Sequence, residues 1–331
     1  MDPFLWHGYI SLGTNLMRVG EIDQARKYFK KVQDEYNFHV QTHNMLLLLE
    51  KYKEFKIFST QHFKIRIHVK EADALHNLVK EKLEKAFATL TKRYNFVPET
   101  PVYFEMLPTH KDFSVRTIGL DSLGASGACF GKVITQVSPQ SLRLGYYNWA
   151  SVAWHEFAHV ITLQLTNFKI PRWFTEGLSE YTEKVRNPSC KRKLDLHLYS
   201  VYSAKQMRNM KNLNEGFTRP KYAMEIAICY YQAQLICEFI TKKFGFDKIM
   251  QMLLLYKQGK KDAQVFEITF DMTLREFDKI FINWVKKNIF AKMNVFPTVS
   301  KKNLDNLKDV IVEKPKDIEH VEKETENPIF N

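Results

Sequence analysis

The stretch Trp154-His155-Glu156-Phe157-Ala158-His159 sets two imidazoles four residues apart and a carboxylate directly after the first. On a helix, residues i and i+4 share a face, so His155 and His159 can offer nitrogens to one metal ion. Glu156 points slightly away from the face that His155 and His159 share. Its carboxylate is then not a metal ligand, but it can reach a water molecule bound to the metal. This arrangement indicates a zinc-dependent hydrolase.

The residues around this stretch predict a buried helix. Asn148 stands where an N-cap residue is expected. The positions after it are apolar on several sides of the helix: Trp149, Val152, Ala153, Phe157, Val160, Ile161 and Leu165. A helix that is apolar nearly all round is buried. Two histidines and a glutamate inside it are costly unless something satisfies them, and a divalent metal would do so.

A third ligand is expected from a second helix that follows a break at Asn167 to Pro171. Its sequence is Arg172-Trp173-Phe174-Thr175-Glu176-Gly177-Leu178-Ser179-Glu180-Tyr181. Two helices joined by a short loop pack against each other, which lets Glu176 face the imidazole pair. Glu180, one turn further on, is predicted to accept a hydrogen bond from the non-ligating nitrogen of His155. Glu183 is assigned to a solvated, charged face.

These two segments together resemble the gluzincin metallopeptidases, and most closely the peptidase MA-like domains found beside tetratricopeptide (TPR) repeats. The resemblance implies one zinc ion (Zn2+) per chain, bound by His155, His159 and Glu176, with Glu156 as the general base. The spacer from His159 to Glu176 is shorter than in the aminopeptidase branch of the superfamily, so the loop between the helices must differ there.

Composition narrows the class of protein. The 331 residues are 45% hydrophobic, which is ample for a sizeable core. The net charge of +12 comes from lysines and arginines spread along the chain without a nucleic-acid-binding motif, so the sequence predicts no nucleic acid and a basic surface that favours acidic partners. Four cysteines without a C-x-x-C spacing indicate buried thiols. No signal peptide or membrane span is visible, and the expected location is cytoplasmic.

The first 55 residues resemble a TPR segment. Leu12-Gly13, Leu16, Gly20, Ala25 and Phe29 fall at the packing positions of one full repeat, and residues 40–55 look like the start of another. A TPR-like segment suggests a protein partner. The alternative, which we favour, is a helical cap on the catalytic domain or the remnant of a longer array.

Residues 56–140 are expected to form an α/β lobe with an edge strand. A strand pair turns near residues 60–62, a helix spans Glu71 to Tyr94, and a strand follows at Thr100 to Leu107. Ala128 to Val137 is predicted as the edge strand above the metal, where a peptide could add by β-augmentation. The aminopeptidase branch places a glutamate in this strand. The stretch from Gly124 to Gly131 has no acidic residue, which argues against an aminopeptidase.

Residues 141–292 are predicted to be a helical zinc-binding lobe, and residues 293–331 a disordered tail. Residues 186–219 are expected to be a long excursion over the site. Tyr222 to Phe244 is expected to be a helix that ends at Gly245. By resemblance this helix carries the tyrosine that stabilises the transition state, and the matching position is Tyr230, with Tyr231 as the adjacent alternative.

The sequence therefore predicts an α+β fold of the zincin-like metallopeptidase type, with a small sheet lobe, a mainly helical lobe and a short N-terminal TPR-like helical segment. The predicted activity is hydrolysis of a peptide or protein substrate through a metal-activated water. Two alternatives stay open, a non-catalytic zinc-binding scaffold and a TPR-type adaptor protein.

Overall fold

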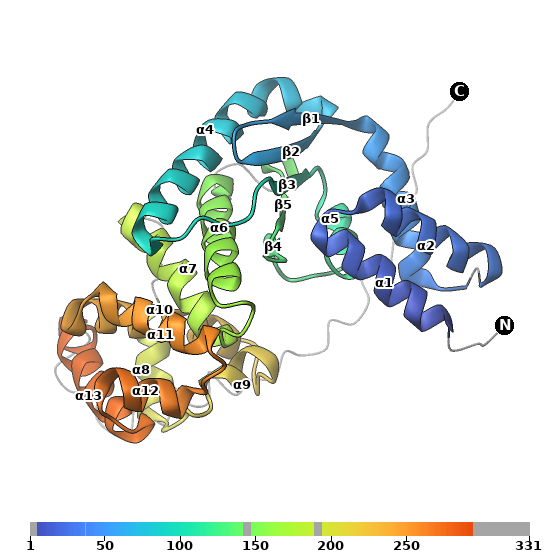
Figure 1. Ribbon diagram of the computed structural model, residues 1–331. Helices are drawn as coiled ribbons and strands as arrows, with labels where there is room; N and C mark the ends of the chain where they lie inside the picture. The colour runs from blue at the N-terminus through green and yellow to red at the C-terminus, as the bar shows by residue number, and fades with distance from the viewer. Residues whose placement is uncertain (1–4, 37, 142–146, 189–193, 294–331) are drawn as a thin grey trace, which may run out of the picture.

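The computed structural model describes residues 5–36, 38–141, 147–188 and 194–293 (Figure 1). The predicted disordered tail lies outside these residues, apart from Met293. The fold is mixed, mostly helical with one small sheet. Its helices are α1 (Leu5–Val19), α2 (Ile22–Glu35), α3 (Val40–Lys51), α4 (Val69–Tyr94), α5 (His110–Ile118), α6 (Trp149–Leu165), α7 (Arg172–Arg186), α8 (Asp195–Ser203), α9 (Leu213–Thr218), α10 (Glu225–Phe244), α11 (Phe246–Lys257), α12 (Asp262–Phe270) and α13 (Leu274–Asn288).

The sheet has five strands in the order β1-β2-β3-β5-β4: β1 (Phe55–Ser59), β2 (Phe63–His68), β3 (Val102–Leu107), β4 (Gly127–Cys129) and β5 (Val133–Val137). The β1–β2 and β4–β5 pairs are antiparallel, and β3 runs parallel to both β2 and β5. The predicted hairpin at residues 60–62 and the long helix after it are confirmed. The single strand predicted over Ala128 to Val137 is wrong, because the chain turns back there and only β4 lies at the edge.

Each face of the sheet packs on different helices. Alternate residues of β2 and β3, such as Ile65 and Phe104, join α4 and α6 in the main core. On the other face, Leu107 and Val137 pack with α5 and with residues of α1–α3 such as Phe29. Figure 1 shows α4 arching over the sheet, α7 beside α6, and α8 to α13 on the far side of this pair. The helix pair that carries the predicted ligands therefore lies between the sheet and the C-terminal helices.

A buried ionic cluster ties α1 to the sheet. Arg116 of α5 is almost fully buried, and its Nε donates to Oε2 of Glu105 on β3 at 2.6 Å. Its Nη2 donates to the carbonyl oxygen of Met17 on α1 at 2.8 Å, and the hydroxyl of Tyr52 donates to Glu105 at 3.0 Å. A charge removed from water needs partners of this kind. The first helices are thus part of the same packed structure as the sheet.

Four helices were not predicted from the sequence, namely α5, α8, α9 and α12, and α8 and α9 lie inside the expected excursion. The excursion over residues 186–219 therefore holds two helices where a loop was expected. The predicted helix ending at Gly245 is confirmed as α10. Among the helices described, none combines the length and apolar character that a membrane span requires. Cys129, Cys229 and Cys237 form no disulfide in the described part of the chain.

Candidate metal centre

The two histidines project from α6, a helix that begins where the sequence predicted. The side chain of Asn148 accepts a hydrogen bond from the backbone N–H of Ser151 at 3.1 Å, which satisfies one of the free donors of the first turn. Phe157 of the same helix packs against Phe63 of β2, with ring centroids 5.4 Å apart. The histidine-bearing helix is therefore held against the sheet, and its two imidazoles face away from it toward α7.

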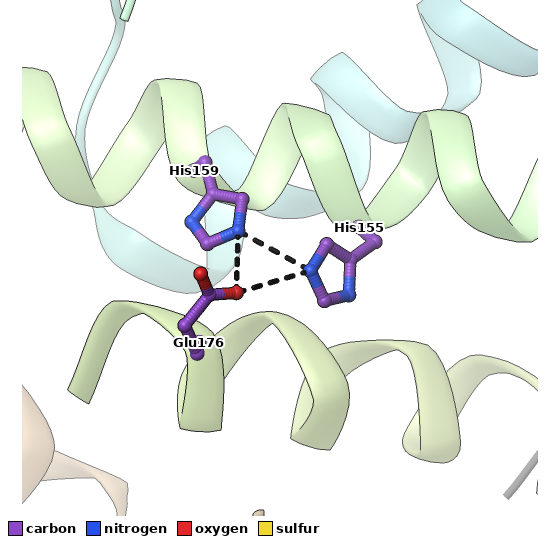
Figure 2. A group of neighbouring side chains, drawn as sticks. All are labelled: His155, His159 and Glu176. Carbon is purple, nitrogen blue, oxygen red and sulfur yellow. Dashed lines mark hydrogen bonds and ion pairs between the residues drawn. The ribbon is translucent and has the colours of Figure 1, made fainter. Parts of the chain in front are cut away.

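Helix α7 runs antiparallel to α6 and brings Glu176 to the imidazoles (Figure 2). The Nε2 atoms of His155 and His159 are 3.2 Å apart. Oε2 of Glu176 lies 3.1 Å from Nε2 of His159 and 3.6 Å from Nε2 of His155. The structure thus brings together the three residues that were predicted from the sequence as ligands, and their donor atoms could hold a metal ion.

The size of this triangle fits a tetrahedral zinc ion. Zinc binds imidazole nitrogen and carboxylate oxygen at about 2.0–2.2 Å, so two ligand atoms on one tetrahedron are about 3.3–3.6 Å apart. The three observed separations are close to that value. Three protein ligands leave the fourth position open, as in catalytic zinc sites. The donor set and its spacing therefore fit zinc.

The Nδ1 atom of His159 has a hydroxyl partner. It lies 2.7 Å from Oγ1 of Thr175, which lies 2.8 Å from Oγ1 of Thr162, and that hydroxyl reaches the carbonyl oxygen of Ala158 at 3.1 Å. Because the carbonyl can only accept, a consistent direction has Nδ1–H donating to Thr175, Thr175 to Thr162, and Thr162 to the carbonyl. This chain leaves the Nε2 lone pair of His159 available to a metal.

The Nδ1 atom of His155 has a carboxylate partner, Oε2 of Glu183 at 3.5 Å. The expectation that Glu183 belongs to a solvated face is wrong, because its side chain is only 19% exposed and faces the imidazole. Glu180 is buried nearby, and its charge helps to raise the pKa of His155. Its hydrogen bond to His155 stays a prediction.

The charges of the site stabilise one another. Burial alone would lower the pKa of His155, but hydrogen bonds to the carboxylates of Glu176 and Glu183 hold it well above the ordinary value. Burial would raise the pKa of Glu176, but the two imidazoles hold it well below its usual range. Without a metal, the carboxylate of Glu176 therefore favours a protonated imidazole beside it. With Glu176 ionised, the position between the imidazoles and the carboxylate attracts a cation.

Glu156 lies on the side of α6 that faces the edge strand. A Cβ placed on Gly127 of β4 would fall 2.6 Å from Oε1 of Glu156, so glycine allows the strand to approach this carboxylate. Burial raises the pKa of Glu156, although His155 and His159 oppose the shift. Tyr147 is close enough that the charge of Glu156 adds to the effect of burial in raising its pKa. The raised pKa makes Glu156 a better proton acceptor than an ordinary carboxylate.

The two candidate tyrosines of α10 point to different places. Tyr230 hydrogen-bonds to Glu176 and Arg172, and burial together with the charge of Glu176 raises its pKa. The hydroxyl of Tyr231 donates instead to Asp195 of α8. Gly177 lets α10 come this close to α7, because a Cβ there would fall 2.7 Å from the carbonyl oxygen of Ala233. Tyr230 is therefore the tyrosine beside the candidate ligands.

Sequence reasoning missed Thr175 and Arg172 as neighbours of the site. Both flank the predicted ligand on the same helix: Thr175 is adjacent to Glu176, and Arg172 lies one turn before it. The i,i+4 spacing from Arg172 to Glu176 was a usable signal for an ion pair. The hydroxyl chain had no comparable signal, since it depends on how α6 and α7 pack.

The fold and this helix pair define a mixed α/β protein with a candidate zinc centre. A family model of the peptidase MA superfamily matches residues 122–287, slightly more than half of the chain. The chain belongs to the peptidase MA superfamily, whose members are peptidases and typically zinc-dependent. A search of curated proteins gave no match.

Proposed function

We propose that the protein is a gluzincin-type zinc peptidase in which His155, His159 and Glu176 bind one zinc ion and Glu156 is the general base. The observation that carries this proposal is the triangle of donor atoms with tetrahedral spacing, with a buried carboxylate beside it that is not part of the triangle. Both Nδ1 atoms have acceptor partners, which favours the ligand tautomer at each histidine.

In this proposal zinc supplies Lewis acidity, polarising the scissile carbonyl group and acidifying the attacking water. Glu156 accepts the proton of that water and delivers it to the leaving amine. Its buried position excludes bulk water and raises its affinity for the proton. Gly127 leaves room for the carboxylate between α6 and β4, next to the edge along which we expect the substrate backbone to lie.

Tyr230 donates a hydrogen bond to the oxyanion that forms on the attacked carbonyl group. Its raised pKa keeps the phenol protonated, so it can act as a donor at neutral pH. Its contacts with Glu176 and Arg172 hold the hydroxyl near the ligand triangle. Tyr231 is engaged with Asp195 and has no part in the proposal.

We also infer the division of the chain that the sequence suggested. The α/β lobe lies within residues 56–140 and the helical lobe within residues 141–292, and the TPR-like segment within residues 1–55 acts as the cap that the sequence analysis favoured. The bond from Arg116 to the carbonyl of Met17 supports a cap, since it joins α1 to the buried centre of the sheet lobe.

The proposal is tested with Glu156→Gln. An amide cannot accept the proton, and loss of a general base lowers turnover on the order of 10²- to 10⁴-fold. The variant should keep zinc, because Glu156 is not a ligand. The measurement is hydrolysis of a mixed peptide library by zinc-loaded wild type and variant, each with its metal content verified. Glu267→Gln, on the exposed face of α12, makes the same chemical change away from the site and should cleave like wild type.

Two results would contradict the proposal. Equal cleavage by wild type and Glu156→Gln would assign the activity to another mechanism. Stoichiometric zinc retained after replacement of His155, His159 and Glu176 by Ala would assign the metal to another site. A protein that binds zinc through these residues but cleaves no peptide would be the scaffold that the sequence also allowed.

A further inference from the structure

The first turn of α7 carries a cation beside the candidate metal centre. Arg172 lies four residues before Glu176, and its Nε is 3.4 Å from Oε1, the oxygen of that carboxylate that does not face the imidazoles. Its side chain is 49% exposed, whereas the side chains of the triangle are nearly buried. Arg172 is therefore a charged group within one helical turn of the metal position that a ligand can reach from solvent.

The guanidinium group of Arg172 is held in place by aromatic neighbours. It donates a hydrogen bond to the hydroxyl of Tyr230 and lies over the ring of Phe217, 6.0 Å from the ring centroid. The ring of Phe217 in turn contacts that of Tyr230, with centroids 5.1 Å apart. A guanidinium group has five N–H donors in a rigid fork, and these two contacts with Glu176 and Tyr230 do not use the whole fork. The group is preorganised to bind a planar anion.

Charge is distributed unevenly along α7. On the C-terminal side of Glu176 the helix presents the carboxylates of Glu180 and Glu183 near His155. On the N-terminal side, Pro171 lines a cavity of about 660 Å³ whose wall also carries four lysines: Lys169, Lys211, Lys260 and Lys261. The acidic residue in that wall, Asp262, is hydrogen-bonded to Tyr256 and Trp173. The potential is therefore mainly positive around the N-terminal end of α7 and mainly negative toward its C-terminal end.

We propose that Arg172 is a specificity-determining residue, which binds a carboxylate of the substrate close to the bond that is cut. This inference rests on the proposed peptidase function. The carboxylate is either the C-terminal group of the substrate or an acidic side chain, and both offer two oxygens to the guanidinium fork. A hydrogen-bonded charge pair of this kind corresponds to a preference of about 10- to 100-fold in kcat/KM over the uncharged analogue.

The test uses pairs of peptides built on any sequence that the wild type cleaves. One pair differs only in a C-terminal carboxylate against a carboxamide, and the others differ in Glu against Gln at single positions beside the cleaved bond. kcat/KM is measured for zinc-loaded wild type, Arg172→Gln and Lys92→Gln. Lys92 is exposed on α4 and provides the same loss of one positive charge away from the site.

The wild type and Lys92→Gln should prefer the carboxylate member of one pair, and the pair that shows the preference identifies the source of the carboxylate. Arg172→Gln should lose that preference, because its kcat/KM falls about 10- to 100-fold more for the carboxylate peptide than for the uncharged member. Equal loss for both members would limit Arg172 to positioning Glu176 and Tyr230, and would overturn the inference. A wild type that cleaves both members of every pair equally would overturn it as well.

A binding measurement separates this inference from the proposed function. Affinity of the same peptides is measured by fluorescence anisotropy with zinc-loaded Glu156→Gln, alone and combined with Arg172→Gln. Tighter binding of carboxylate peptides that disappears with Arg172→Gln supports the inference even if no peptide is hydrolysed. Equal binding of both members, or no binding of any, overturns it even if peptide hydrolysis is established.

Discussion

Replacement of Thr175 by Val removes the first hydroxyl of the chain behind His159 with little change in side-chain volume. Thr162 keeps its bond to the carbonyl of Ala158. The group that loses its partner is the Nδ1–H of His159, in surroundings where Thr175 is 6% exposed and Thr162 is fully buried. An unsatisfied donor in such a place costs about 1–3 kcal/mol.

This cost falls on the zinc-bound protein and not on the apoprotein. With zinc bound, Nε2 of His159 is a ligand, and a neutral imidazole must then carry its proton on Nδ1. Without zinc, the imidazole can carry its proton on Nε2, which lies 3.1 Å from the carboxylate of Glu176 and can donate to it. Thr175→Val should therefore weaken zinc binding about 10- to 100-fold and change the stability of the apoprotein much less.

Competition with a chelator of known affinity measures the zinc dissociation constant, and thermal unfolding of the apoprotein measures its stability. Thr175→Ser keeps the hydroxyl and should bind zinc like wild type. Thr166→Val removes another buried threonine hydroxyl nearby, at the C-terminal cap of α6, which donates to the carbonyl of Thr162 at 2.7 Å, and it should leave zinc affinity unchanged. Unchanged affinity in Thr175→Val, or an equal loss in Thr166→Val, would refute the reasoning.

Three further changes have defined outcomes. Gly127→Ala should lower peptide turnover about tenfold or more without loss of zinc, because the new methyl group displaces the carboxylate of Glu156; a loss of zinc measured by metal analysis would contradict this. Burial raises the pKa of Asp278 from 3.8 to about 6, so its ionised form is disfavoured in the folded state and stability falls as the pH rises from about 4 to about 6. Asp278→Asn should therefore unfold at a higher temperature than wild type at pH 7 but not at pH 3.5. An equal difference in unfolding temperature at both pH values would show that the titration of Asp278 is not the cause. Arg116→Met leaves the carboxylate of Glu105 buried with fewer partners and should lower the free energy of unfolding, measured by chemical denaturation, by about 3–5 kcal/mol. Adding Glu105→Gln to this variant should restore part of the loss.

The ligand triangle was predictable because its signal is local. The i,i+4 histidines and the glutamate after the loop follow from helix periodicity and from the packing of two connected helices. The contact of His155 with Glu183 was not predicted, although the helix periodicity contained it. Seven residues make almost two full turns, so Glu183 lies closer to the face of Glu176 than Glu180 does. Helix α7 is antiparallel to α6, so residues of α7 that follow Glu176 lie closer to His155 than to His159. Glu183 is one of these residues.

The hairpin at residues 127–137 and the four missed helices depend on contacts between distant segments. Val133 pairs with Tyr103, and the turn before it brings β4 to the edge where Gly127 meets Glu156. A run of glycine and apolar residues carries little periodicity from which to place that turn. The missed helices α5, α8, α9 and α12 are each nine residues long or shorter, too short to show a clear pattern of their own.

The packing of Phe157 between Phe63 and Phe87 has a consequence for producing the protein. A fragment cut at the limits of the family match would begin at residue 122 and keep α6 and α7, with every candidate ligand. It would lack β1, β2, β3 and α4, so the aromatic side of α6 would face water and β5 would have a bare edge where β3 now pairs. Such a fragment should aggregate when expressed, and an inactive preparation of it would say nothing about catalysis.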